Sequence, residues 1–247
     1  MFTNKYIFTY ATGMVVLVAA ILSSAAMVLK PFQLANIKAE KIQGILASTN
    51  IETSRDAAAA TYEDYIVKEI AVDSEGNVVS VYEDGELKQG DIRPFDIKLK
   101  EQLDMKKKNG DGNPVWPIFV MEKQGSRTYV VPVRGMGLWG PIWGNIAFQE
   151  NFNTIAGATF DHKGETPGLG AEINTNTFED EFKGKTIFDD KGNFVSVDVV
   201  KGGVANSNIP LEHGVDGISG GTITSDGVTA MLENCLENYV PYIKKNK

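Results

Sequence analysis

Residues 6–29 form an uncharged, strongly apolar run close to the start of the chain. As a helix this run would be about 36 Å long, enough to cross the hydrocarbon core of a bilayer with some tilt. A helix also satisfies its own backbone hydrogen bonds, as lipid requires. Tyr6, Phe8 and Tyr10 crowd one end, where interfacial aromatic residues are common. The run therefore predicts one transmembrane helix after a short tail, residues 1–5.

A cleaved signal peptide is the alternative interpretation of this run. The apolar core of a signal peptide is normally much shorter, and Ser24-Ala25-Ala26 is only a passable cleavage site. The flanking charges leave the orientation open. Lys5 lies on one side and Lys30, Lys38 and Lys41 on the other, but long domains translocate largely regardless of such charges.

Charge and cysteine content exclude several functions. The 247 residues include 24 basic and 32 acidic side chains, for a net charge of −8. Nucleic acid is not an expected partner, because binding it requires a basic face. The single cysteine, Cys235, excludes an intramolecular disulfide and an iron–sulfur cluster held by this chain alone.

Beyond the apolar run, periodicity and turn residues predict an α+β domain over residues 61–247. The residue before a proline disfavours helix, so Lys30-Pro31 is expected to end or kink the span. A helical stalk, with an amphipathic helix over residues 32–47, is expected within residues 30–60. Helices are also predicted at 167–182 and 222–239. Two-residue periodicity predicts strands at 66–72, 78–82, 116–122, 128–134, 141–149, 154–162, 186–188 and 194–200. Hairpins between successive strands indicate a mixed, mostly antiparallel sheet with segregated helices.

Two local predictions complete this outline. The final helix is expected to bury one apolar face, made of Ile223, Val228, Met231, Leu232, Cys235 and Tyr239. Residues 105–114 are expected to be a charged, glycine-rich loop. Its sequence fails the EF-hand pattern, because Lys107 and Ile118 occupy the first and last ligand positions.

The first glycine motif covers residues 135–140 and matches GxGxxG letter for letter. A dinucleotide fingerprint also needs a helix directly behind it, so that helix amides meet the pyrophosphate. Here Pro141, Ile142 and Trp143 follow, which favours a strand. We interpret the motif as a tight turn that exposes Leu138 and Trp139; a packed turn with no ligand is the alternative.

The second motif is His162-Lys163-Gly164-Glu165-Thr166-Pro167-Gly168-Leu169-Gly170. His162 and Glu165 lack a third metal ligand at a matching spacing. The glycines instead indicate backbone that approaches something closely, and a planar ligand is one candidate. A structural helix start is the alternative.

The third motif, residues 216–224, precedes the last predicted helix and reads Asp-Gly-Ile-Ser-Gly-Gly-Thr-Ile-Thr. Glycines, hydroxyls and a helix N-terminus together favour the binding of a phosphate group, because free amides and the helix dipole attract an anion. The lysine of a P-loop is absent, so nucleotide hydrolysis is not expected. A plain N-cap is the alternative.

Together the three motifs resemble the C subunit of the sodium-translocating NADH:quinone reductase, a membrane-anchored flavoprotein with an FMN-binding domain. The G subunit of the RNF electron-transport complex shares the second and third motifs. The Gly137-Leu138-Trp139 turn and the character of the anchor favour the sodium pump. A non-redox, membrane-tethered assembly or binding domain, with the third motif as a mere helix cap, remains a further alternative.

The family's flavinylation pattern is Asp, two residues, Ser or Thr, Gly, Ala, then the acceptor. Asp216, Ser219, Gly220 and Thr222 match this pattern, whereas Gly221 stands where alanine is usual. The resemblance implies a phosphoester between the Thr222 hydroxyl and FMN. A separate FAD-dependent FMN transferase would make this bond, with Thr224 as the second candidate acceptor.

The resemblance also implies where the flavin ring lies and what the protein does. The ring is expected to lie against the second motif and the turn, at Glu165, Thr166, Gly168, Leu169, Leu138 and Trp139. The chain is then expected to transfer electrons with other subunits of a bacterial inner-membrane complex that oxidises NADH, reduces quinone and exports sodium. By resemblance, its large domain faces the periplasm.

Overall fold

A computed structural model describes residues 3–108 and 112–246 of the chain. The chain divides into two compact units, Met1–Lys41 and Ile42–Lys247. This division does not test the predicted boundaries after residues 29 and 60. Those boundaries separate a membrane span, a stalk and a domain, and they remain predictions.

Helix α1 runs from Asn4 to Ala47, and its N-terminal part makes up the first unit. Its most apolar window has a mean hydropathy of 2.3 and is fully exposed, so it is long and apolar enough to cross a membrane by length and composition. Lys30-Pro31 was expected to end or kink the span. An end at this point, and with it a separate helix from residue 32, is wrong, because α1 continues through Pro31; the kink remains a prediction. A proline removes one helical hydrogen bond, and the bonds on either side hold the helix together.

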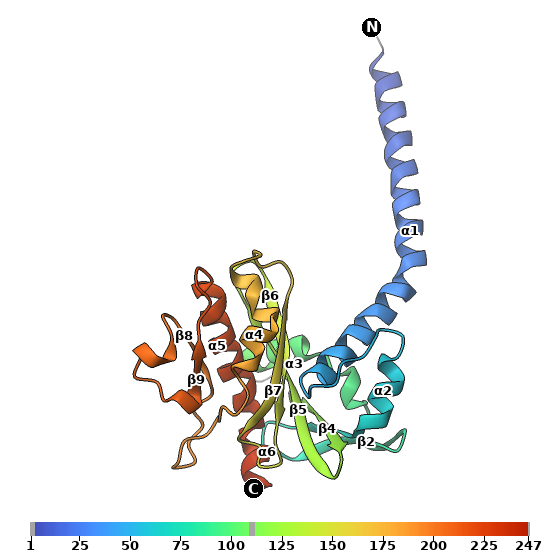
Figure 1. The fold of residues 1–247 in the computed structure, drawn as a ribbon. Helices are drawn as coiled ribbons and strands as arrows, with labels where there is room; N and C mark the ends of the chain where they lie inside the picture. The colour runs from blue at the N-terminus through green and yellow to red at the C-terminus, as the bar shows by residue number, and fades with distance from the viewer. Residues whose placement is uncertain (1–2, 109–111, 247) are drawn as a thin grey trace. The chain divides into compact units, whose positions relative to one another are not determined.

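A seven-stranded antiparallel sheet forms the centre of the second unit, in the order β3-β2-β1-β4-β5-β6-β7 (Figure 1). This confirms the α+β class and the predicted hairpins. The strands are β1 (Ile66–Val72), β2 (Val78–Glu83), β3 (Glu86–Gln89), β4 (Trp116–Lys123), β5 (Ser126–Met136), β6 (Pro141–Phe148) and β7 (Ile155–His162). Strand β3 was not predicted, because its four residues are all exposed and show no alternation.

Both faces of this sheet are covered, as alternation along β4 illustrates. Ile118 and Val120 belong to the main core together with residues of the last long helix. The intervening Phe119 packs on the opposite face, with edge-on contacts to Tyr62 of α2 (Ala58–Tyr65) and to Phe95. Successive side chains of a strand point to opposite faces, so one strand supplies both layers.

Helices and short elements surround the sheet. Helix α5 (Thr222–Leu236) contacts β5, and α4 (Asn176–Asp180) contacts β7 (Figure 1). The remaining helices are α3 (Leu99–Lys107), α6 (Val240–Lys245) and the 3₁₀ turns η1 (Pro94–Asp96), η2 (Gly170–Asn174), η3 (Val204–Asn206), η4 (Leu211–His213) and η5 (Glu237–Tyr239). Strand β8 (Asp198–Val200) pairs in parallel with β9 (Gly214–Asp216), outside the main sheet.

Three local predictions need correction. Residues 105–107 form the last turn of α3 rather than a loop, whereas residues 109–111 lie outside the described part. The helix predicted over 167–182 is only η2 and α4, because Gly168 has a positive φ of 75° and Thr175 is extended. Of the strand predicted at 194–200, only β8 (Asp198–Val200) is observed. The strand predicted at 186–188 is absent from the described structure, where this segment forms only isolated bridges such as Phe188 with Phe194.

Candidate functional site

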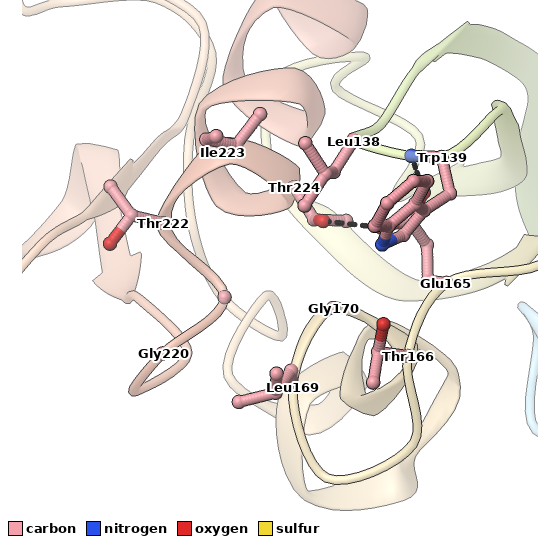
Figure 2. Close-up of a pocket in the computed structure, with 11 residues that line it drawn as sticks. Leu138, Trp139, Glu165, Thr166, Leu169, Gly170, Gly220, Thr222, Ile223 and Thr224 are labelled. Atoms are coloured by element: carbon pink, nitrogen blue, oxygen red, sulfur yellow. Dashed lines mark hydrogen bonds between the residues drawn. The ribbon is translucent and has the colours of Figure 1, made fainter.

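A cavity of about 220 Å³ lies where three segments of the second unit meet (Figure 2). These segments are the turn between β5 and β6, the loop that follows β7, and the beginning of α5. The cavity is lined by Leu138, Trp139, Glu165, Thr166, Leu169, Gly170, Gly220, Gly221, Thr222, Ile223 and Thr224. All three sequence motifs therefore contribute to one site.

The turn between β5 and β6 contributes two exposed apolar side chains. The Gly137 amide donates a 2.8 Å hydrogen bond to the Gly140 carbonyl and closes the turn. Leu138 is 49% exposed and Trp139 68% exposed, as the sequence predicted. Strand β6 begins immediately afterwards at Pro141, so no helix follows the GxGxxG match.

Glu165 lies at the centre of the three segments and is only 4% exposed. Its Oε1 accepts a 2.9 Å hydrogen bond from the Trp139 amide, and its Oε2 accepts a 2.6 Å bond from Thr224 Oγ1. Burial raises the pKa of this carboxyl, but the bonds from Thr224 and from the Trp139 and Leu138 amides outweigh burial and lower its pKa below the ordinary value. Glu165 is therefore a buried carboxylate held in its ionised form.

Two glycines permit the backbone to enclose this carboxylate. A Cβ on Gly137 would lie 2.6 Å from Glu165 Oε1, and one on Gly170 would lie 2.6 Å from Oε2. The Gly170 Cβ would also collide with Thr224 Oγ1. A side chain at either position would require the carboxylate or its neighbours to shift.

The loop after β7 is shaped by short-range hydrogen bonds. His162 Nδ1 accepts a 3.1 Å bond from the Glu165 amide, and the Leu169 amide donates a 3.1 Å bond to the Thr166 carbonyl. Leu169 is consequently presented at the edge of the cavity and remains exposed.

Helix α5 begins at the cavity without a side-chain cap. Gly221 is its N-cap, and Thr222 is its first residue and is partly exposed. Within residues 3–108 and 112–246, no hydrogen bond occupies the amides of Thr222 and Ile223. Unpartnered amides of a first helical turn, together with the helix dipole, favour an anion at this position.

Ile223 contradicts the predicted apolar face of the last helix, because it is 58% exposed and lines the cavity. At 100° per residue, Ile223 lies about 140° around the helix from Val228. Val228 and the other four residues of the predicted face are buried in the core. The helical phase could have separated Ile223 from them in advance.

Three predicted site residues lie outside the lining of the cavity: Asp216, Ser219 and Gly168. Asp216 Oδ1 accepts a 2.8 Å hydrogen bond from the Val204 amide, so its observed contact shapes the neighbouring loop. Conversely, nothing in the sequence indicated Ile223 as a site residue, Gly170 was noted only as one of the close-approach glycines of the second motif, and Thr224 was considered only as an acceptor. The close approach expected for these glycines is found at Gly170, where a Cβ would collide with Thr224 Oγ1.

Comparisons with known proteins agree on one family. The family model of the FMN-binding domain matches residues 137–237, a segment that holds the second and third motifs and the last four residues of the first. The C subunit of the Na⁺-translocating NADH-quinone reductase of Vibrio anguillarum is 33% identical over 214 residues, which are 84% of this chain and 80% of that protein. The C subunit from Haemophilus ducreyi is 31% identical over 241 residues, 92% of this chain and 88% of that protein.

A solved structure extends this similarity to three dimensions. The crystal structure of the C subunit of the Na⁺-translocating NADH-quinone reductase from Parabacteroides distasonis superposes with a TM-score of 0.72 at 40% sequence identity. The match covers 87% of this chain and 96% of that one.

Proposed function

The chain belongs to the family formed by the C subunits of the Na⁺-translocating NADH-quinone reductase, and on this premise we propose that it is an electron-transfer subunit carrying FMN on Thr222. Its partners are the other subunits of a membrane complex that oxidises NADH, reduces quinone and transports sodium. FMN supplies the capacity to take up and release electrons. The chain supplies the site, the anchor and the surroundings of the ring.

The cavity fits the two unlike ends of FMN. Four exposed apolar side chains surround it and offer contact surface to a planar ring: Leu138, Trp139, Leu169 and Ile223. The first residues of α5, which line the same cavity, have unpartnered amides that can bind the phosphate of FMN. Apolar contact would exclude water from the ring and thereby influence its potential.

The difference between two threonines is the observation that carries the assignment of Thr222. Thr224 is 1% exposed, and its hydroxyl is used in the hydrogen bond to Glu165. Thr222 lines the same cavity, is partly exposed, and lies at the N-terminus of α5. An enzyme that attaches FMN can reach the hydroxyl of Thr222 and not that of Thr224.

The attachment is a phosphoryl transfer from FAD catalysed by a separate transferase. Thr222 Oγ1 forms a bond to the phosphorus of the FMN half, and the bond from that phosphorus to the bridging oxygen breaks. AMP leaves with that oxygen, and the threonine hydroxyl loses its proton. No electrons are exchanged, and the phosphoester carries negative charge that the α5 amides stabilise.

The N-terminal part of α1 serves as the single membrane anchor in this proposal. Its length and hydropathy support one crossing. Family resemblance is the basis for assigning the 61–247 domain to the periplasmic side of a bacterial inner membrane.

Intact mass measured on the chain co-produced with the transferase tests this proposal. The expected mass exceeds that of the polypeptide by one FMN less one water, and the denatured band fluoresces under ultraviolet light. Thr222→Ala should abolish both signals, whereas Thr224→Ser should retain them. Fluorescence that survives in Thr222→Ala would move the attachment elsewhere, and an unmodified mass in the parent chain would favour a non-redox domain.

A further inference from the structure

We propose that Glu165 is the positioning residue of this site: its carboxylate fastens the turn of residues 137–140 to the first turn of α5. It thereby fixes Leu138 and Trp139 beside the cavity. Only the effect on bound flavin rests on the function proposed above. The fastening itself is a property of the chain alone.

The two carboxylate oxygens hold two different elements. Oε1 accepts from the Trp139 amide at 2.9 Å, whereas Oε2 accepts from the Thr224 hydroxyl at 2.6 Å. The Leu138 amide also interacts with this carboxylate. Hydrogen bonds to an ionised acceptor are stronger than bonds between neutral groups, so one side chain joins three segments that are distant in sequence.

The exposure of Trp139 indicates why such a fastening is needed. Its side chain is 68% exposed and therefore has little packing to hold it. Its backbone amide, by contrast, is held by a carboxylate that is almost fully buried. The position of this residue thus depends on the hydrogen bond to Glu165 more than on contacts of the indole.

Glutamine can reproduce both bonds without the charge. Its carbonyl oxygen, at the place of Oε1, can accept from the Trp139 amide. Its NH₂ group, at the place of Oε2, can donate to Thr224 Oγ1, because a hydroxyl also accepts. Glu165→Gln should therefore preserve the position of the turn, whereas Glu165→Ala removes both bonds.

Glu179 provides a matched control. Its Oε1 accepts a 2.7 Å hydrogen bond from the Phe160 amide, so it too is a glutamate side chain that holds a backbone amide. It is absent from the lining of the cavity. Glu179→Ala therefore reproduces the loss of a hydrogen bond between a glutamate side chain and a backbone amide, without changing a residue that lines the cavity.

Amide hydrogen exchange of the full-length, flavin-free chain in detergent is the first test. Loss of a buried bond to a charged group should raise exchange at Leu138 and Trp139 about tenfold or more in Glu165→Ala. Glu165→Gln should remain close to the parent chain. Glu179→Ala should accelerate Phe160 and leave Leu138 and Trp139 unchanged. Unchanged exchange at Leu138 and Trp139 in Glu165→Ala would overturn the proposal.

If Glu165→Ala does not fold, Thr224→Val is used in its place for the exchange measurement. It removes only the bond between the carboxylate and α5, so exchange at Trp139 should rise by a smaller factor. Parent-like exchange at Trp139 in Thr224→Val would then overturn the fastening of the turn to α5.

The second test uses the flavinylated full-length chain. Iodide quenching of FMN fluorescence should increase several-fold in Glu165→Ala and return to the parent level in Glu165→Gln. Equal quenching in Glu165→Ala and Glu179→Ala would contradict a positioning role toward the flavin. A parent chain that carries no flavin would refute the proposed function, and the exchange measurements would still decide the role of Glu165.

Discussion

The Thr224 hydroxyl donates a 2.6 Å hydrogen bond to Glu165 Oε2, across 59 positions of sequence. Both residues are almost fully buried. This bond joins the loop after β7 to the first turn of α5, and it distinguishes Thr224 from the partly exposed Thr222 two residues earlier. Stability and cofactor attachment should therefore respond differently to changes at these two threonines.

Thr224→Val should destabilise the fold, because it leaves a buried carboxylate oxygen without its donor. The expected loss is about 1.5–3 kcal/mol. Thr224→Ser keeps the hydroxyl and removes one methyl group, so it should cost about 1 kcal/mol. Thermal unfolding of the flavin-free chain measures both losses. Thr222→Val is the matched control, and a loss at Thr222 as large as that at Thr224 would contradict the assignment.

Gly170→Ala should disrupt the site, because a Cβ there would collide with Thr224 Oγ1 and approach Glu165 Oε2 to 2.6 Å. Overpacking of this kind typically costs about 1–3 kcal/mol. Gly164→Ala is the control in the same loop, since nothing lies within 4 Å of a Cβ at that position. The melting temperature should fall for Gly170→Ala and stay near the parent value for Gly164→Ala. Equal melting temperatures would show that the enclosure of Glu165 is not tight.

Acid should remove a stabilising contribution of Glu165. Its pKa in the fold is lowered from the ordinary value of 4.5, because hydrogen bonds from Thr224 and the turn amides outweigh the opposing effect of burial. The unfolded chain therefore binds this proton more readily, and the contribution is present above pH 4.5 and lost as the pH falls through the lowered pKa. Denaturant unfolding at several pH values should show a shallower acid loss in Glu165→Gln than in the parent chain.

Glu179 should have the opposite pH dependence. Burial raises its pKa to about 7, and nearby Asp180 and Asp161 add to this effect, although the Phe160 amide opposes it. The folded chain then binds the proton more readily than the unfolded chain, so this stabilising contribution is complete below pH 4.5 and is lost as the pH rises through about 7. Glu179→Gln should reduce the fall in stability between these values. An unchanged pH profile would argue against the raised pKa.

Cys235 should resist alkylation in the folded chain. It is buried on α5, and burial raises the pKa of its thiol to about 11. The thiolate is the reactive form, so iodoacetamide at mildly alkaline pH should label Cys235 only after unfolding. Mass spectrometry with and without denaturant measures this difference. Rapid labelling of the native chain would mean that the end of α5 opens readily.

Much of the sheet could be predicted from sequence, because its hairpins are local and alternate in polarity. The pairs β1 with β2 and β4 with β5 each enclose a short turn, so neighbouring residues carry the signal. The seven-strand order, by contrast, pairs β1 with β4 across a long intervening stretch of chain, and no local pattern encodes that partner. Strand β3 has no buried face to reveal it.

Local patterns predicted the parts of the site, and only the family resemblance predicted that these parts gather around one ligand. Glycine spacing and helix-start residues indicated three binding segments, and all three line one cavity. The buried bond between Glu165 and Thr224 was not predictable, because it depends on the packing of α5 against β5. Pro31 shows the opposite limit. The local rule allowed either an end or a kink of the helix there, and the helix does not end at Pro31.

Thr222 begins a helix whose other end, at Cys235 and Leu236, is buried in the core. A redox group esterified to Thr222 would not be attached through a flexible segment of the protein, because its attachment point is the first residue of a helix. Its reach would be limited to one short side chain and its own sugar-alcohol phosphate linker. Delivering electrons to a more distant acceptor would then require the whole FMN domain to travel, or the acceptor to come to it.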